Sequence, residues 1–437
     1  MDRRRFLSQT GLLLGTLGID KYFELDLMEK LGQAVLTPTA DAAENEPRRL
    51  LELCFRRGIP MMMFATGKEF AQLGSPAYSN FSYAGNDIIK APEVTNLFFN
   101  TDSRPLLKHA ANIAITQGVR NESGHTDLFD FREGGSGKKK VTPIVELADS
   151  NTTSAVLHGV RFPGFARNVA GNRRDLIALN SVAGFVSLFK NPRLAFTVGE
   201  LESVLTASRK LSRRQALLLQ DKLNGALDQE QAHDKAMQMF TSDYAKLLDI
   251  SSMASELQPT GSYKDTRQAI ALSLKGFATN LINSSMVTIE LGDWHDYASD
   301  KQNATIIADF SAMLDAAVTY LKTTPEPSAP GKTLWDTTTI VAGSEFTRGI
   351  SRFGSDNSDG DTQGAMLIGK NVVGNYYGGF TLTGGGRGIA HGFDNLSGTA
   401  VMDSKNSTEG LYQTIRRVAG LRLLTTEHEK VFKCMVG

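Results

Sequence analysis

The stretch MVTIELGDWHDYASD, residues 286–300, decides the fold class, because an apolar, β-branched run ends abruptly in acids that flank a histidine. Residues 303–321, NATIIADFSAMLDAAVTYL, carry apolar side chains at helical spacing, and residues 338–344, TTIVAGS, form a second short apolar run. This order predicts a strand, a helix and a second strand parallel to the first. The stretch therefore indicates a parallel sheet covered by helices.

The same alternation of short apolar runs and helical patterns extends along the chain, which favours an α/β fold. The other expected strands occupy residues 50–55, 112–119, 155–162 and 365–369. Residues 199–280 show helical periodicity and capping signals, which predict a helical insertion or subdomain. We therefore expect one α/β domain over residues 43–437 that contains this insertion.

The composition is that of an ordinary globular protein. The chain has 437 residues, 41% of them hydrophobic, and 47 Lys plus Arg balance 47 Asp plus Glu. Without an excess of one charge sign, no net field attracts nucleic acid, so we expect no nucleic-acid partner. No apolar run reaches the roughly 18 residues of a membrane-spanning helix, so we expect no transmembrane span. Cys54 and Cys434 lack CxxC spacing and indicate neither a zinc site nor a disulfide framework.

The amino terminus carries an export pattern. In MDRRRFLSQTGLLLGTLGI, residues 1–19, Arg3 and Arg4 precede Phe6-Leu7 and an uncharged, mildly apolar run, as in twin-arginine signals. A small-residue cleavage pattern comes later, in residues 40–42, so we expect a leader over residues 1–42 whose cleavage point is open. The other interpretation is a cytosolic helix that begins with arginines. The export pattern predicts a periplasmic or extracellular protein.

Polar side chains follow two of the expected strands. Asp293 and His295 follow the apolar run at 286–291, and Glu345 follows residues 338–344 directly. Ligands of open α/β sheets bind where the carboxyl ends of strands meet, and carboxylates with neutral imidazoles are ligands of divalent metals. These three side chains are therefore candidate metal ligands. Asp and His at strand ends also cap helices or face solvent, so a site without metal is the other interpretation.

A third polar segment, NESGHTD at residues 121–127, follows the strand expected at 112–119. Ser123 or Thr126 at a helix start could act as a nucleophile, because free N–H groups there stabilise an anion. His125 could orient a substrate. Serine and threonine are also the commonest helix N-caps, and a histidine can simply bond a backbone carbonyl. Both interpretations of the segment are open.

The leader, GDWHD at one strand end and VAGSEFTRG at the next resemble the exported bacterial family of unknown function numbered 1501, whose usual motifs are W-D-T-H and S-E-F-G-R-T-P. That family is grouped with the alkaline phosphatase and sulfatase superfamily. Residues 109–135 and 407–421 are similar to further segments of the family. The resemblance covers roughly residues 105–160 and 285–421.

This resemblance implies an alkaline-phosphatase-like scaffold. It implies that Asp293 and His295 hold one metal, and that Glu345 stands where the superfamily has ligands of a second. Ser123 or Thr126 would be the nucleophile. The implied reaction is hydrolysis of a phosphate or sulfate ester, in which paired metals neutralise charge on the attacking and leaving oxygens.

The sequence departs from the family pattern in two places. CFRRGIPMMMF, residues 54–64, contains no acid where the family supplies a ligand after its first strand, and its methionines are expected to fill core. DGDTQG offers Asp361 but no histidine where the family has G-R-D-H-W, and His391 in GIAHGFD is a candidate substitute.

These departures favour a degenerate metal site that holds one divalent ion of unknown identity or none. We therefore expect an exported binding or assembly protein on an alkaline-phosphatase-like scaffold. Its ligand would be an exported protein partner or an anionic ester. An active metal-dependent phosphoester or sulfate-ester hydrolase is the alternative, because the fold alone does not determine the function.

Overall fold

The structure is a computed structural model of the whole chain. It describes residues 46–55, 58–59, 61–69, 88–120, 143–150, 153, 155, 157–162, 177–178, 250–253, 257, 261–289, 300–344, 362–382, 388–421 and 430–437. All of them belong to one of the two compact units of the chain, which comprises residues 41–182 and 248–437. The expected leader, and most of the helical insertion expected at 199–280, lie outside the described residues.

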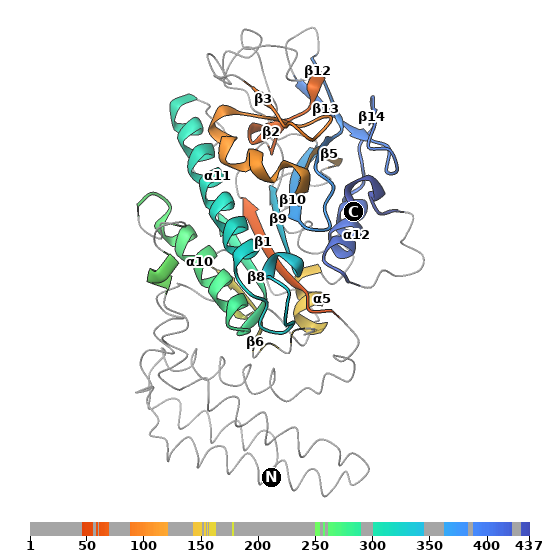
Figure 1. Cartoon of the computed structure of the whole chain (residues 1–437). Helices are drawn as coiled ribbons and strands as arrows, with labels where there is room; N and C mark the ends of the chain where they lie inside the picture. The colour runs from red at the N-terminus through yellow and green to blue at the C-terminus, as the bar shows by residue number, and fades with distance from the viewer. Residues whose placement is uncertain are drawn as a thin grey trace, which may run out of the picture. The chain divides into compact units, whose positions relative to one another are not determined.

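A mixed eight-stranded sheet forms the centre of this unit (Figure 1), and its strands lie in the order β11-β5-β10-β9-β1-β8-β6-β7. The bounds are Arg49–Phe55 (β1), Ile113–Arg120 (β5), Leu157–Phe162 (β6), Ile177–Ala178 (β7), Ile282–Ile289 (β8), Thr338–Ser344 (β9), Thr362–Gly369 (β10) and Asn375–Tyr377 (β11). Neighbouring strands are parallel, except that β10 is antiparallel to β9 and β5. The expected α/β class, with a mostly parallel sheet covered by helices, is confirmed.

β8 begins earlier than its apolar pattern indicates, at Ile282 rather than Met286. The added residues include Asn283 and Ser285, which are buried. The helices that pack on the sheet bond some of their polar atoms: the Ser285 and Ser273 hydroxyls lie 2.6 Å apart, and Asn283 Nδ2 donates to Leu147 O over 3.0 Å, while Asn283 Oδ1 has no partner among the described residues. Buried polar groups with such partners cost little, so this half of the strand can be polar.

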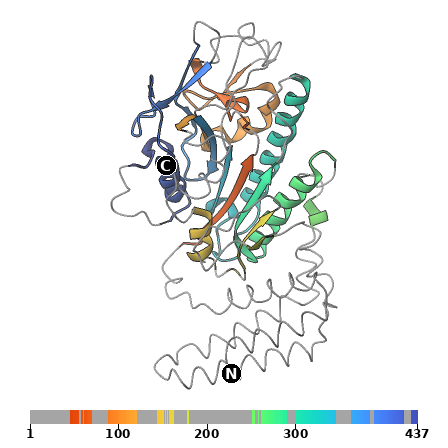
Figure 2. The same ribbon diagram turned by 180° about the vertical axis from the view of Figure 1, so that it is seen from behind.

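The described α-helices cover both faces of the sheet (Figures 1 and 2). α10 (Lys264–Ala278) and α11 (Asp300–Thr323) lie on one face, and α5 (Pro143–Ser150) and α12 (Thr408–Val418) lie on the other. α11 is the helix expected at residues 303–321. It follows β8 and leads back to β9, and β1 occupies the place between these two strands.

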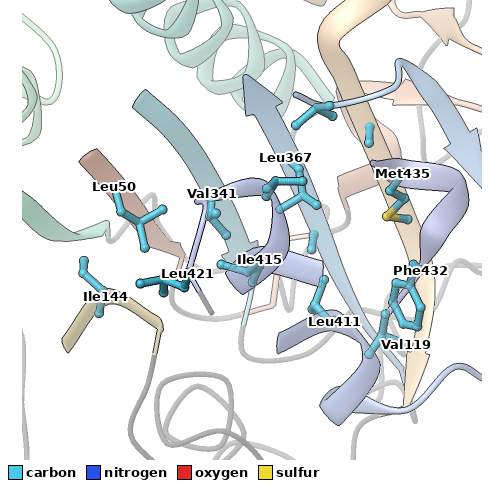
Figure 3. Packing of buried hydrophobic residues seen from close by; sticks show 14 of the residues in the cluster. Leu50, Val119, Ile144, Val341, Leu367, Leu411, Ile415, Leu421, Phe432 and Met435 are labelled. Atoms are coloured by element: carbon cyan, nitrogen blue, oxygen red, sulfur yellow. The ribbon is translucent and has the colours of Figure 1, made fainter. Parts of the chain in front are cut away.

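The hydrophobic core under α5 and α12 holds this second face together (Figure 3). Side chains from three central strands, Leu50, Val341 and Leu367, meet Ile415 of α12 in one buried cluster. Its other labelled members are Val119, Ile144, Leu411, Leu421, Phe432 and Met435. Each fully buried aliphatic side chain of this kind stabilises the fold by roughly 1.5–3 kcal/mol relative to exposure, so this face rigidly supports the strand ends.

Smaller elements flank the main sheet. One three-stranded sheet contains β2 (Ala65–Thr66), β4 (Phe98–Phe99) and β3 (Ile89–Lys90), and another contains β12 (Gly379–Leu382), β13 (Gly388–Phe393) and β14 (Ala400–Val401). The described 3₁₀ helices are η1 (Met61–Met63), η3 (Thr101–Asn112), η6 (Ile250–Met253), η7 (Leu334–Asp336) and η9 (Lys433–Met435).

Candidate functional site

The carboxyl ends of the central strands meet at one edge of the sheet. Phe55 at the end of β1 lies level with Ile289 of β8 and with Ser344 of β9, and the three strands are parallel. β5 runs in the same direction as β9, because β10 lies antiparallel between them, and Arg120 at its end is paired with Thr362. The predicted site residues closely follow β5, β8 and β9 in the sequence or closely precede β10. The chain therefore connects to each of them at this carboxyl edge of the sheet.

Most of the predicted site residues lie close in sequence to these strand ends but outside the described residues. They are Ser123, His125, Thr126, Asp293, His295, Glu345 and Asp361. The predicted parallel arrangement of the strands before Asp293 and Glu345 is confirmed, with β1 between them. The convergence of the side chains themselves stays a prediction.

β1, after which the family resemblance would place a metal ligand, ends at Phe55, and the described side chains packed around that residue are apolar. The rings of Phe55, Phe64 and Phe310 form a packed group, with centroid distances of 4.7 Å between Phe55 and Phe310 and 5.9 Å between Phe64 and Phe310. The three methionines of η1 are buried beside this stretch. The expectation that these methionines fill core is confirmed.

His391 lies on β13 and is 2% exposed. Its Nδ1 accepts the backbone N–H of Asp403 over 3.1 Å, so its Nε2 carries the ring proton, which is directed to Thr381 Oγ1 at 2.6 Å. Both ring nitrogens are therefore already hydrogen-bonded, Nε2 with β12 and Nδ1 with a residue just after β14. A metal ion at His391 would have to displace one of these bonds.

The carboxyl edge carries positive charge where β5 ends. Asn406 forms a bridge with Val119, and it accepts from the Arg120 N–H over 2.8 Å and donates to Gly118 O over 2.9 Å. This pairing brings Lys405 near Arg120. Burial and the Arg120 guanidinium lower the pKa of Lys405. Two cationic side chains therefore lie near each other at this end of the sheet.

Two buried glutamines at this end of the sheet were missed by the sequence reasoning. Gln363, near the start of β10, directs Nε2 to Arg120 O at 3.2 Å and to Thr408 Oγ1 at 3.1 Å, while its Oε1 has no hydrogen-bond partner. Gln117 of β5 accepts the Met62 N–H over 3.3 Å. A glutamine inside a mostly apolar strand, close to the carboxyl edge of the sheet, was the available signal.

The described residues contain no group of three or more His, Cys, Asp or Glu side chains that could hold a metal ion. Within the same residues, no helix is long and apolar enough to cross a membrane.

The two cysteines lie in different surroundings. Cys54 Sγ lies 3.4 Å from Glu52 Oε1. Burial is the main cause that raises the pKa of Cys434 to about 12, so this thiol stays protonated and unreactive at neutral pH.

Comparison with known proteins gives limited similarity. No family model matches the sequence, and no curated protein matches it. The crystal structure of Ps i-CgsB matches with 12% identity and a TM-score of 0.35, over 89% of this chain and 75% of that chain. Its complex with k-i-k-neocarrahexaose matches with 12% identity and a TM-score of 0.33, over 88% and 74%. Similarity at these TM-scores carries no argument about the site or its ligand.

Proposed function

We propose that the chain is an exported binding or assembly protein built on an alkaline-phosphatase-like scaffold whose metal site is degenerate. Its ligand is an anionic ester or an exported protein partner. The proposal combines the twin-arginine pattern, the motifs GDWHD and GSEF after two parallel strands, and the departures of the sequence from the family pattern. Location outside the cytoplasm follows from the leader.

The absence of an acid at the exit of β1 is the observation that carries the proposal. β1 is a central strand, and its carboxyl end lies level with the ends of β8 and β9. A two-metal site at this edge needs several anionic or imidazole ligands to offset four positive charges. The strand instead ends in the ring of Phe55, packed against Phe310, and the sequence from Cys54 to Phe64 contains no acid. This exit therefore contributes no ligand.

His391 supports the same conclusion. It was a candidate substitute for the histidine missing after the second motif. Its two ring nitrogens are engaged by Thr381 and Asp403, and it is buried within the small sheet. The ligand set therefore reduces to Asp293, His295, Glu345 and Asp361, which suits one divalent ion or none.

The alternative function, an active metal-dependent phosphoester or sulfate-ester hydrolase, is favoured by one observation. The strands β5, β8 and β9 end at the same edge at which β10 begins. Ser123, Asp293, Glu345 and Asp361 all lie close to these ends in sequence, which is the arrangement that a nucleophile and its metal would require.

Metal analysis of the native, full-length protein tests the degenerate site. We expect at most one divalent ion per chain, and we expect Asp293→Ala to abolish its binding. Asp265→Ala is the matched control, because Asp265 is an exposed acid in the first turn of α10. Two stoichiometric ions in the wild-type protein would overturn the proposal in favour of the hydrolase.

Hydrolysis of p-nitrophenyl phosphate and p-nitrophenyl sulfate gives the second test, with zinc, manganese, magnesium or calcium added. We expect no turnover above background. Turnover of about 1 per second or faster, the low end for ordinary enzymes, would establish the hydrolase if Ser123→Ala or Asp293→Ala abolished it. Ser404→Ala is the control, since the Ser404 hydroxyl bonds only its own turn, at Val401 O.

A further inference from the structure

A chain of three polar side chains joins η3, which leads into the start of β5, to α11. Asp315 Oδ1 lies 2.8 Å from His109 Nε2, and Lys322 Nζ lies 3.1 Å from His109 Nδ1. His109 is 4% exposed. Asp315 and Lys322 both belong to α11, so the imidazole of η3 is held between two side chains of one helix.

The partners of His109 determine where its proton lies. A lysine ammonium has donors only, so Nδ1 must accept from Lys322 and therefore has no proton. The ring proton is then on Nε2, where it is donated to the Asp315 carboxylate. The described geometry is thus that of a neutral imidazole, with a donor on one side and an acceptor on the other.

The charges around His109 are unbalanced. Lys322 of α11 and Lys108 of η3 are positive, and Asp315 is the carboxylate that faces the ring; Lys108 Nζ lies 2.8 Å from the same oxygen, Oδ1. β4 and β10, which also pack against η3, contain no ionisable side chain. Burial, followed by the charges of Lys322 and Lys108, lowers the pKa of His109, although Asp315 opposes the shift.

Trp335 of η7 fixes the position of Lys322. The Nζ atom lies 4.8 Å from the centre of the indole ring, within the range of a cation–π interaction. The Lys322 ammonium is therefore held from two sides, by the neutral imidazole and by the ring. Lys322 therefore links His109 to Trp335.

We propose that Lys322, His109 and Asp315 form an acid-sensitive latch between η3 and α11. When His109 takes a second proton, Nδ1–H points at the Lys322 ammonium, and donor faces donor. The ammonium leaves the imidazole and Trp335, while the imidazolium keeps its bond to Asp315. Acidification thus removes one of the two contacts that tie η3 to α11 through His109. The latch does not depend on the function proposed above.

The sign of the pH effect follows from the lowered pKa of His109. The unfolded chain takes up a proton at the ordinary histidine pKa, about 6.5, while the folded chain resists it to lower pH. The stability contributed by the neutral, latched histidine is complete above that value. It is lost as the pH falls through the pKa of the folded state.

Histidine NMR of the full-length protein, labelled with ¹³C and ¹⁵N at its 7 histidines, tests the latch. His109→Gln assigns the resonance. We expect the Nε2–H tautomer at pH 8 and a titration midpoint below the ordinary value. Lys322→Met should move the midpoint upward, because the facing charge is gone. A wild-type midpoint at or above the ordinary value, or one unmoved by Lys322→Met, would overturn the proposal.

Lys108→Met is the matched control, because Lys108 bonds the same Asp315 oxygen but does not touch the imidazole. Its effect on the midpoint should be smaller than that of Lys322→Met. The indole N–H resonance of Trp335 reports the release of Lys322, and Trp294→Phe identifies it, since the chain has 2 tryptophans. This resonance should shift with the midpoint of His109. A shift that persists in Lys322→Met would refute the release step.

Discussion

Arg49 and Glu326 form a bidentate ion pair that is closed off from solvent at the amino edge of the sheet. Arg49 Nη2 lies 2.6 Å from Glu326 Oε1, and Nε lies 2.9 Å from Oε2; both side chains are 0% exposed. The other guanidinium donors reach Ile282 O and Asn280 Oδ1, and Thr337 donates its hydroxyl to Glu326. The pair therefore ties the start of β1 to β8 and to the segment before β9.

Arg49→Met should destabilise the protein by about 3–5 kcal/mol, because it leaves the Glu326 carboxylate buried without its partner. The double variant Arg49→Met, Glu326→Leu should lose less stability, since neither of the two buried charges remains. Urea denaturation at neutral pH measures both. The control is Lys332→Met, which removes an exposed pair with Glu46 and should cost about 0–1 kcal/mol. Equal losses in the single and double variants would contradict the argument.

The lowered pKa of Asp336 predicts that the folded protein loses stability in acid. The hydrogen bond from Lys370, followed by that from the Thr333 N–H, lowers its pKa from 3.8 to about 2. Because the pKa is lower in the folded state, the stabilisation is complete above 3.8 and is lost as the pH falls through about 2. Asp336→Asn should cost about 1–2 kcal/mol at pH 7, allowing for its partial exposure.

Urea denaturation of the wild type and of Asp336→Asn at pH 7, 5 and 3 checks this prediction. The difference in the free energy of unfolding between the wild type and Asp336→Asn should stay constant from pH 7 to pH 5 and become smaller at pH 3. Lys370→Met should remove part of the same stabilisation, since Lys370 Nζ lies 2.6 Å from Asp336 Oδ1. A difference that grows on acidification would show that the sign is wrong.

Gly118 of β5 allows β13 to lie directly on the main sheet. A Cβ atom there would be 2.1 Å from the carbonyl oxygen of His391, which is backbone and cannot move aside alone. Gly118→Ala should therefore destabilise the protein by about 1–3 kcal/mol, as overpacking usually does. Gly369→Ala is the control, because its nearest atom would be 3.5 Å away. Thermal unfolding that does not distinguish the two variants would refute the close approach.

Export by the twin-arginine route predicts a specific dependence on Arg3 and Arg4. Replacement of both by Lys should leave the full-length protein in the cytoplasm, because the paired arginines are the recognised part of such a signal. Arg5→Lys is the control and should be exported. Fractionation of expressing cells measures the distribution. Periplasmic recovery of the Arg3, Arg4 double variant at the wild-type level would exclude this route.

The strand positions were largely predictable from the sequence, because short β-branched and apolar runs suit buried strands. The run TTIVAGS coincides with β9. The direction of β10 was not predictable, since residues 365–369 read the same in a parallel or an antiparallel strand. The start of β8 was missed because Asn283 and Ser285 owe their burial to partners elsewhere in the fold.

The candidate site was predictable only as a set of strand ends. Residues that follow strands are visible in the sequence, and the absence of an acid after β1 was visible as well. The environment of His391 was not, because its partners depend on how the small sheet pairs. His109 was also unpredictable, since its partners Asp315 and Lys322 lie 206 and 213 residues away in the chain.

The antiparallel direction of β10 has a consequence for how this protein can be altered. A parallel neighbour must be reached by a crossover of fixed minimum length, whereas β10 returns the chain at the edge where β9 leaves it. Ser344 at the end of β9 and Thr362 at the start of β10 therefore lie at the same edge of the sheet. Doubling the length of a flexible connection between two fixed ends costs only about 0.6 kcal/mol. We therefore expect that a reporter domain inserted between these two strands, away from Glu345 and Asp361, leaves the register of the sheet unchanged.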